Sequence, residues 1–332
     1  MKNIFEPATD FNFKPAEFVP FKDRELCEKL RKISGTDLEQ REAWHHPEFN
    51  IKVMMNPHPV LIATLFSRIK EASEKGKKFT MILGNPEPDT YIPLAQLINY
   101  FKVDCKNVHI FAMDEWADDQ GNIAPETYQA GFAHSMLKYL VYNIDEKLRM
   151  PLSQVHYPTN KNIDSYSDMI TDAGEGGADI CSSSPGWTGH MAFIDPVKDF
   201  FPEGFDGSKE PTKEQIDEWL NMKARLVDLH PLTVAQNSLH GVFGQSGYIA
   251  DVPPKAATIG PVDVKNSRER IEVHALLTNA TFSSWQRMTS RLVLHGPVTP
   301  LIPSSMLQTM KTQVLVSDEL AAPFECWEKV GY

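Results

Sequence analysis

The chain has 332 residues, which is enough to bury a large core, and an α/β domain of this size can form a single unit. Its formal net charge of −11 at pH 7 argues against nucleic acid and anionic membrane surfaces as partners. The sequence shows neither an apolar run of transmembrane length nor a signal-peptide pattern at its start, so we expect a cytoplasmic protein.

Residues 1–48 are rich in proline, phenylalanine and charge, and we interpret them as an N-terminal extension with one amphipathic helix at Arg24–Ile33. From Phe49 onward, apolar runs and amphipathic stretches alternate, which is typical of βαβ order. The predicted strands are Phe49–Met54, Phe79–Leu83, Val108–Met113, Asp179–Ser183, Arg225–Leu229, Ile271–Leu277 and Thr312–Val316. The predicted helices are His58–Ala72, Tyr91–Phe101, Thr127–Tyr142, Ile163–Asp172 and Phe282–Leu292. This order predicts an α/β fold, a Rossmann-like three-layer sandwich with a mostly parallel central sheet, formed by residues 49–332 as one domain.

A polar stretch, residues 197–223, would make a long excursion between two strands. It contains Thr212-x-x-Gln215, the pattern of a capping box, ahead of a short helix. Long excursions beside sites are often lids, and a surface insertion without a chemical role explains the pattern equally well.

Two acidic residues follow the apolar strand that begins at Val108. Asp114 and Glu115 come directly after it, ahead of a predicted polar loop, and ligands of open α/β sheets bind outside the carboxyl ends of the strands. A second segment places His190 and Asp195 shortly after another apolar run. Adjacent strand residues point to opposite faces, so we expect Asp114 to enter the shared cleft as the base, and we expect Glu115 to contribute to substrate binding.

Three motifs carry a resemblance to a known family. Phe111-Ala-Met-Asp-Glu-Trp116, Pro125-Glu-Thr-Tyr128 and Gly189-His-Met-Ala-Phe193 with Asp195-Pro196 are similar, in order and spacing, to motifs of the glucosamine-6-phosphate deaminase/isomerase family. The relatives of that family include 6-phosphogluconolactonases. Phe193 favours the deaminase branch, because the lactonase branch typically has a Thr-Ala-Ser run at this point.

The resemblance implies a mechanism. Asp114 would take a proton from C2 of an open-chain amino sugar and return it at C1, His190 would help to open the ring, and Asp195 would orient His190. A carboxylate can shuttle a proton between adjacent carbons, and imidazole can donate and accept near neutral pH. The implied partner is a small sugar, and the family usually assembles, which allows a homo-oligomer.

The sequence departs from the family at the histidine. The aspartate that the family places two residues before it is Thr188 here, and the later glutamate is Asp195, which is shorter by one methylene. Loss of an acidic neighbour should make His190 easier to deprotonate.

The phosphate site departs further. The family's glycine- and threonine-rich loop corresponds to 83–90, where two prolines lack N–H donors and two acids repel phosphate. The family's lysine and arginine fall here near Thr281 and at Ser238 or Leu239. We therefore predict an unphosphorylated or atypical sugar. The residues expected to bind its hydroxyls or amine are Asn85, Glu87 and Asp89.

Trp187 and the scattered histidines and cysteines each allow more than one interpretation. Trp187 could stack on a sugar face or simply pack in the core, and we favour a ligand contact for it and for Thr188. No metal and no cofactor are predicted, because the histidines at 45, 46 and 58 lack ligand spacing and the four cysteines are scattered. The alternatives that stay open are a lactonase-type hydrolase and a sugar-binding protein that has lost catalysis.

Overall fold

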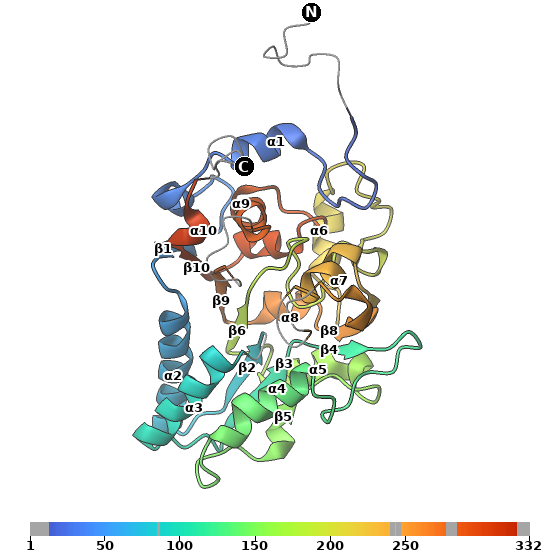
Figure 1. Cartoon of the computed structure of the whole chain (residues 1–332). Coiled ribbons are helices and arrows are strands. Elements are labelled where there is room, and N and C mark those ends of the chain that lie inside the picture. The colour runs from blue at the N-terminus through green and yellow to red at the C-terminus, as the bar shows by residue number, and fades with distance from the viewer. Residues whose placement is uncertain (1–12, 85–86, 240–242, 244–246, 277–283, 324–332) are drawn as a thin grey trace, which may run out of the picture.

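A parallel sheet runs through the centre of the molecule (Figure 1). The computed structural model describes residues 13–84, 87–239, 243, 247–276 and 284–323. Within this part of the chain the sheet has seven strands in the order β1-β10-β9-β6-β2-β3-β5, and all neighbouring pairs are parallel. Its strands are β1 (Phe49–Met54), β2 (Phe79–Leu83), β3 (Val108–Ala112), β5 (Val155–His156), β6 (Ile180–Ser183), β9 (Glu269–His274) and β10 (Thr312–Ser317). The predicted fold class, with a mostly parallel central sheet, is confirmed.

A small second sheet modifies the predicted order. The residues after β3 do not form a polar loop but a buried strand, β4 (Asp114–Ala117), which pairs antiparallel with β8 (Lys255–Thr258). The predicted strand near Arg225 is β7 (Arg225–Asp228), and it pairs with β8 and not with the central sheet. The sequence did not indicate β4, because a buried strand normally reads as an apolar run and this one begins with two acidic residues.

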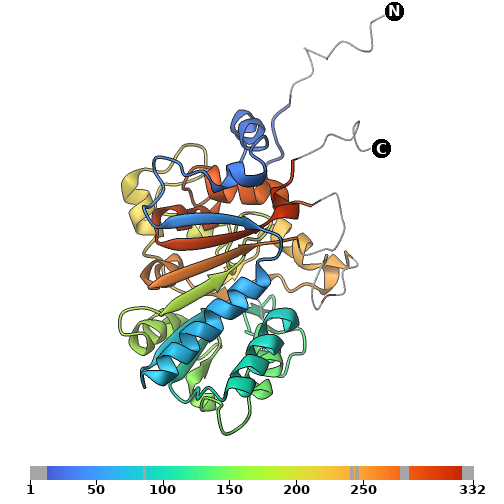
Figure 2. The ribbon, with the colours of Figure 1, turned by 90° about the vertical axis from the view of Figure 1, so that its left-hand side faces the viewer.

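Helices cover both faces of the central sheet. Helices α2, α3 and α4 share one apolar core with the sheet, whereas α5, α8 and α9 share the other, and Figure 2 shows α2 and α3 lying across the sheet. The helices are α1 (Arg24–Leu30), α2 (His58–Glu74), α3 (Pro88–Phe101), α4 (Phe132–Tyr139), α5 (Tyr166–Ala173), α6 (Lys213–Trp219), α7 (Pro231–Asn237), α8 (Pro261–Asn266), α9 (Gln286–His295) and α10 (Asp318–Ala321). None of the described helices has the length and apolar character needed to cross a bilayer.

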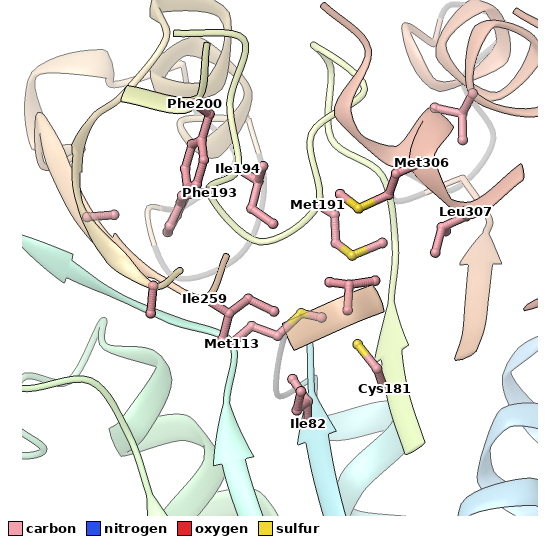
Figure 3. Close-up of a cluster of buried hydrophobic side chains, with 14 of the residues drawn as sticks. Ile82, Met113, Cys181, Met191, Phe193, Ile194, Phe200, Ile259, Met306 and Leu307 are labelled. Atoms are coloured by element: carbon pink, nitrogen blue, oxygen red, sulfur yellow. The ribbon is translucent and has the colours of Figure 1, made fainter. Parts of the chain in front are cut away.

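Alternation along the inner strands feeds the two cores. On β2, Met81 and Leu83 face the α2 side, while Ile82 faces the other side. This second core also receives Met191 and Ile194 from the loop after β6 (Figure 3). Both side chains are fully buried, so they fix the backbone of the loop that carries His190 and Asp195.

The predicted peripheral segments differ in how they attach. The capping box at Thr212 is confirmed: its hydroxyl accepts from the Gln215 amide, and the Gln215 side chain accepts from the Thr212 amide. Helix α6, which follows, buries Trp219 completely. The segment before β1 packs on α9, and Trp44 Nε1 donates to Gln308 Oε1 at 2.7 Å. The division into an extension and one domain stays a prediction.

Candidate active site

The predicted cleft exists at the carboxyl end of the sheet. A pocket, here called the Asp114 pocket, is lined by Asp114 and His190 together with Gly84, Gly186, Phe193 and Gln236, among others. Asp114 enters it because the chain turns from β3 into β4 at this residue: Met113 N donates to Leu83 O at 3.2 Å, and Met113 O accepts from Ile259 N at 2.8 Å. The structure thus brings together two residues that lie 76 positions apart in the sequence (190 − 114).

Asp114 is a buried acid with an acid beside it. Burial raises the pKa of its carboxyl group well above the usual value, and the adjacent Glu115 raises it further. Once ionised, such a carboxylate is a stronger base than an exposed one. These properties suit a group that must first accept a proton and then return it.

Glu115 does not belong to the lining of the Asp114 pocket. It is fully buried, Oε1 accepts from the amides of Trp116 at 2.9 Å and Phe132 at 3.1 Å, and Oε2 accepts from Ala133 N at 2.8 Å. Burial raises its pKa to about 7, although these three hydrogen bonds oppose the rise. The carboxyl group therefore serves the otherwise unpaired N–H groups at the start of α4 and not a ligand.

Glycine at 131 makes room for this cap. A Cβ added at Gly131 would lie 3.1 Å from each carboxyl oxygen of Glu115 and 3.0 Å from Tyr128 O. A side chain at 131 would therefore compete with the carboxyl group for the space at the helix end.

His190 is held by a buried carboxylate. Its Nδ1 lies 3.0 Å from Asp195 Oδ1, and Asp195 is completely buried. Burial alone would raise the pKa of Asp195, but His190 and the surrounding hydrogen bonds hold it below its usual value. Because the carboxylate only accepts, Nδ1 carries the proton, and Nε2 of the neutral ring is left as the acceptor.

Two threonine hydroxyls complete the arrangement around Asp195. Thr188 Oγ1 lies 2.9 Å from both His190 Nδ1 and Asp195 Oδ1, and Thr233 Oγ1 lies 3.0 Å from the first and 2.7 Å from the second. Asp195 Oδ2 accepts from the backbone amide of His230 at 3.1 Å. Thr188 thus supports the carboxylate where the family has a second acid.

The loop geometry around His190 requires glycine at one position. A Cβ at Gly186 would lie 1.9 Å from His190 Nε2, so the imidazole ring sits directly over the glycine backbone. Gly186 N donates to His190 O at 2.8 Å and closes the loop. Any side chain at 186 would displace the ring.

Helix α7 supplies groups that sequence reasoning missed. It carries Thr233, Gln236 and Asn237, of which the last two line the Asp114 pocket. Gln236 Oε1 also accepts from Trp187 N at 2.5 Å. A signal was present, because Pro231 directly after a strand is typical of the first turn of a helix.

The remaining predicted contacts fall in different places. Trp187 does not line the Asp114 pocket, and its ring stacks on Trp285 with centroids 5.9 Å apart. Glu87 lines a second pocket, whereas Asp89 is exposed and lines neither. Asn85 lies outside the described residues, as does Thr281.

The second pocket adjoins the first. It shares Gly84, Ser184 and Pro185 with the Asp114 pocket and is called the Glu87 pocket here. It is also lined by His58, Thr90, His274, Gln286 and Ser290, among others. No lysine or arginine belongs to the described lining of either pocket. No metal-binding cluster of His, Cys, Asp and Glu occurs in the described residues.

Comparison with known proteins agrees with this picture. No family model matches the chain. It is 23% identical to a glucosamine-6-phosphate deaminase of Alkaliphilus oremlandii over 283 residues, which cover 83% of this chain and 98% of that protein. It is 26% identical to a glucosamine-6-phosphate deaminase of Rhodopirellula baltica, with 72% of this chain and 80% of that protein covered.

Solved structures show the same fold at lower identity. A monomeric glucosamine-6-phosphate deaminase has a TM-score of 0.61 and 17% identity, and the match covers 82% of this chain and 98% of that one. A 6-phosphogluconolactonase of Thermotoga maritima has a TM-score of 0.51 and 15% identity, with 81% and 99% covered. Fold and pocket together define an α/β protein with a polar pocket at the carboxyl end of a parallel sheet. The chain shares its fold with these deaminases and lactonases and is similar in sequence, at 23–26% identity, to glucosamine-6-phosphate deaminases.

Proposed function

We propose that this protein is a carbohydrate isomerase or deaminase-like enzyme that moves a proton between adjacent carbons of a ring-opened sugar. The observation that carries the proposal is the shared pocket: Asp114 and His190 line it together, and Asp195 fixes the orientation of the histidine. A base and a proton-transfer group on one pocket are what ring opening followed by C2 deprotonation requires.

The roles follow from the protonation states. His190, with Nδ1 bound to Asp195, presents Nε2 to accept the proton of the ring hydroxyl and then to return it to the ring oxygen. Asp114 takes the C2 proton, which leaves an enediol-like intermediate, and delivers a proton to C1. Burial and the adjacent Glu115 raise the pKa of Asp114, which makes its ionised carboxylate a stronger base for this step.

The sugar is proposed to lack the phosphate. A phosphate dianion in a partly buried site needs cations or N–H donors to replace its hydration, at a cost of several kcal/mol when they are absent. The described lining of both pockets has neither lysine nor arginine. Two basic residues near the start of β7 are engaged elsewhere: Lys223 pairs with Asp168, and Arg225 donates to Asp199 O.

Hydrogen exchange tests the reaction class. An isomerase or deaminase incorporates deuterium from heavy water at C1 or C2 of the sugar, and proton NMR of glucosamine and fructose incubated with the protein would show it. A lactonase-type hydrolase opens lactones without such exchange. Binding without exchange or turnover would instead identify a catalytically lapsed sugar-binding protein.

Calorimetry tests the phosphate. Glucosamine should bind more tightly than glucosamine 6-phosphate, because each 1.4 kcal/mol of lost hydration without compensation is about a tenfold change in affinity. If the phosphorylated sugar binds and turns over better, the phosphate is held by groups outside the two described linings.

A further inference from the structure

The side chains that line the Glu87 pocket indicate the charge of the ligand that would fit it. Its described lining contains one carboxylate, two histidines and several hydroxyls, without a cationic side chain. It joins the Asp114 pocket through Gly84, Ser184 and Pro185. A sugar whose C1 and C2 lie at Asp114 would therefore extend its far end toward Glu87.

Four hydrogen-bond donors around this pocket are already used inside the protein. Tyr91 Oη donates to Gly84 O at 2.9 Å, and Gln286 Nε2 donates to Ala275 O. The amides of Thr90 and Tyr91 both donate to Glu87 O, at 3.2 and 3.0 Å. An anionic ligand would find few free N–H or O–H groups among these residues.

A buried relay turns Ser290 into an acceptor as well. His274 is 1% exposed, its Nδ1 lies 2.8 Å from Ser290 Oγ, and its Nε2 lies 3.7 Å from Oε2 of the fully buried Glu272. Neither oxygen of Glu272 nor Nε2 of His274 has a hydrogen-bond partner among the described residues, so the carboxyl group acts on the ring as a nearby charge. The carboxylate favours a proton on Nε2, so Nδ1 accepts from Ser290, whose oxygen lone pairs are left for the pocket.

Glu87 carries the one carboxyl group in the described lining of this pocket, and this group can accept hydrogen bonds from a ligand. It stands at the N-cap of α3, yet its side chain makes no capping hydrogen bond. Burial raises its pKa, and Asp89 raises it further. A carboxylate in this position has no cationic partner in the described lining and would be stabilised by a ligand that brings one.

We propose that the Glu87 pocket binds a protonated amino group carried by the part of the sugar remote from C1 and C2. The inference rests on the proposed function and narrows its substrate class to sugars with a cationic substituent at the far end. Glu87 accepts one N–H of the ammonium group, and Ser290 Oγ accepts another. The pocket is thus specific for a charge opposite to that of a phosphate.

Calorimetric titration with three matched sugars tests this: 6-amino-6-deoxyglucose, glucose and glucose 6-phosphate. At neutral pH we expect the amino sugar to bind about tenfold more tightly than glucose, since a hydrogen bond to a charged group contributes about 1.5–3 kcal/mol. The 6-phosphate should bind least. Equal affinity for the amino sugar and glucose, tightest binding of the phosphate, or no binding of any of the three overturns the proposal.

Variants locate the effect. Glu87→Gln should reduce the amine preference to about threefold or less. Glu146→Gln, at an exposed acid outside both linings, should leave the preference unchanged. Glu87→Lys should shift the preference toward the phosphate and serves if the Glu87→Gln variant folds poorly. A preference that survives both Glu87 variants contradicts the assignment.

The two proposals fail separately. Asp114→Asn should stop exchange of the C2 hydrogen but keep the amine preference, because binding at Glu87 does not need the base. If exchange is found on neutral sugars without any amine preference, the proposed function stands and the assignment of the Glu87 pocket falls.

Discussion

The carboxyl group of Asp114 is buried, and its surroundings disfavour the ionised form. Burial is the larger cause of its raised pKa, and Glu115 is the smaller one. When folding raises the pKa of an acid, ionisation of that acid lowers the stability of the folded protein. Below the ordinary pKa of 3.8 the folded and unfolded chains both carry the proton, so this loss of stability is absent. The loss grows as the pH rises above that value. A buried acid that lowers stability and lines a pocket is typical of functional sites.

Replacing Asp114 by asparagine should separate function from stability. We expect proton exchange at C2 to fall by at least about a hundredfold, because the amide cannot accept the proton. The free energy of unfolding at about pH 8 should be equal to or higher than that of the wild type, and this difference should vanish near pH 3. Chemical denaturation and NMR exchange measure the two effects. Near-wild-type exchange would remove Asp114 from the mechanism.

His190 and Asp195 make a second pair with separable roles. His190→Gln should slow turnover of cyclic sugar far more than turnover of an open-chain analogue, because only the cyclic form needs its ring opened. Asp195→Asn should show a milder version of this pattern, since Asp195 orients the imidazole without transferring a proton. Steady-state rates measured with the cyclic sugar and with the open-chain analogue test these roles. Equal losses of rate on the two substrates would show that His190 does not open the ring.

At the scale of elements, the start of α4 depends on a carboxyl group from a strand. Glu115 on β4 accepts the amides of Phe132 and Ala133, so the strand and the helix are fixed to each other beside the Asp114 pocket. Phe132, the first residue of this helix, lines that pocket. Movement of α4 would therefore change the shape of the pocket.

The pH dependence of stability should reveal this cap. The pKa of Glu115 is raised from 4.5 to about 7, so its ionisation should lower the free energy of unfolding progressively between these values. Glu115→Gln should remove that part of the decline, whereas Glu115→Ala should cost about 1–3 kcal/mol throughout, because it leaves buried N–H groups unpaired. Urea unfolding at several pH values tests both variants. A glutamine variant with the wild-type pH profile would contradict the assignment.

At the scale of the whole molecule, one buried arginine joins distant segments. The Arg291 side chain is fully buried on α9 and donates to Ile33 O in the N-terminal segment and to three carbonyl groups at α10. Burial and the nearby Arg287 together lower its pKa to about 10. The N-terminal segment also reaches the site, because Phe18 O lies 3.0 Å from Nε2 of His230, whose backbone amide donates to Asp195.

Arg291→Lys should therefore destabilise the whole chain. A lysine ammonium has three donors in place of five and lacks the planar geometry that reaches several carbonyl groups at once. We expect a loss of about 2–4 kcal/mol in the free energy of unfolding, as is typical when a buried charged network is broken. Arg31→Lys, at an exposed pair with Glu28, is the matched control and should change little. Equal unfolding curves for the two variants would contradict this role.

The sequence by itself determined the parallel sheet and indicated that Asp114 and His190 would lie close together. Continuous apolar runs such as Phe79–Leu83 predicted parallel strands, because a strand buried on both faces needs apolar residues throughout. The carboxyl ends of such strands meet at one edge, which is why Asp114 and His190 could be expected in one pocket. The low-identity match to the deaminases agrees with the motifs that carried the resemblance.

Only the tertiary structure decided which polar groups share a partner. Thr188 and Thr233 lie 45 positions apart (233 − 188), and their common bond to Asp195 depends on how α7 packs against the loop after β6. The role of Glu115 as a cap likewise required the position of α4. Hydrogen bonds between distant segments leave no periodic pattern in a sequence, because their direction is set by packing and not by spacing along the chain.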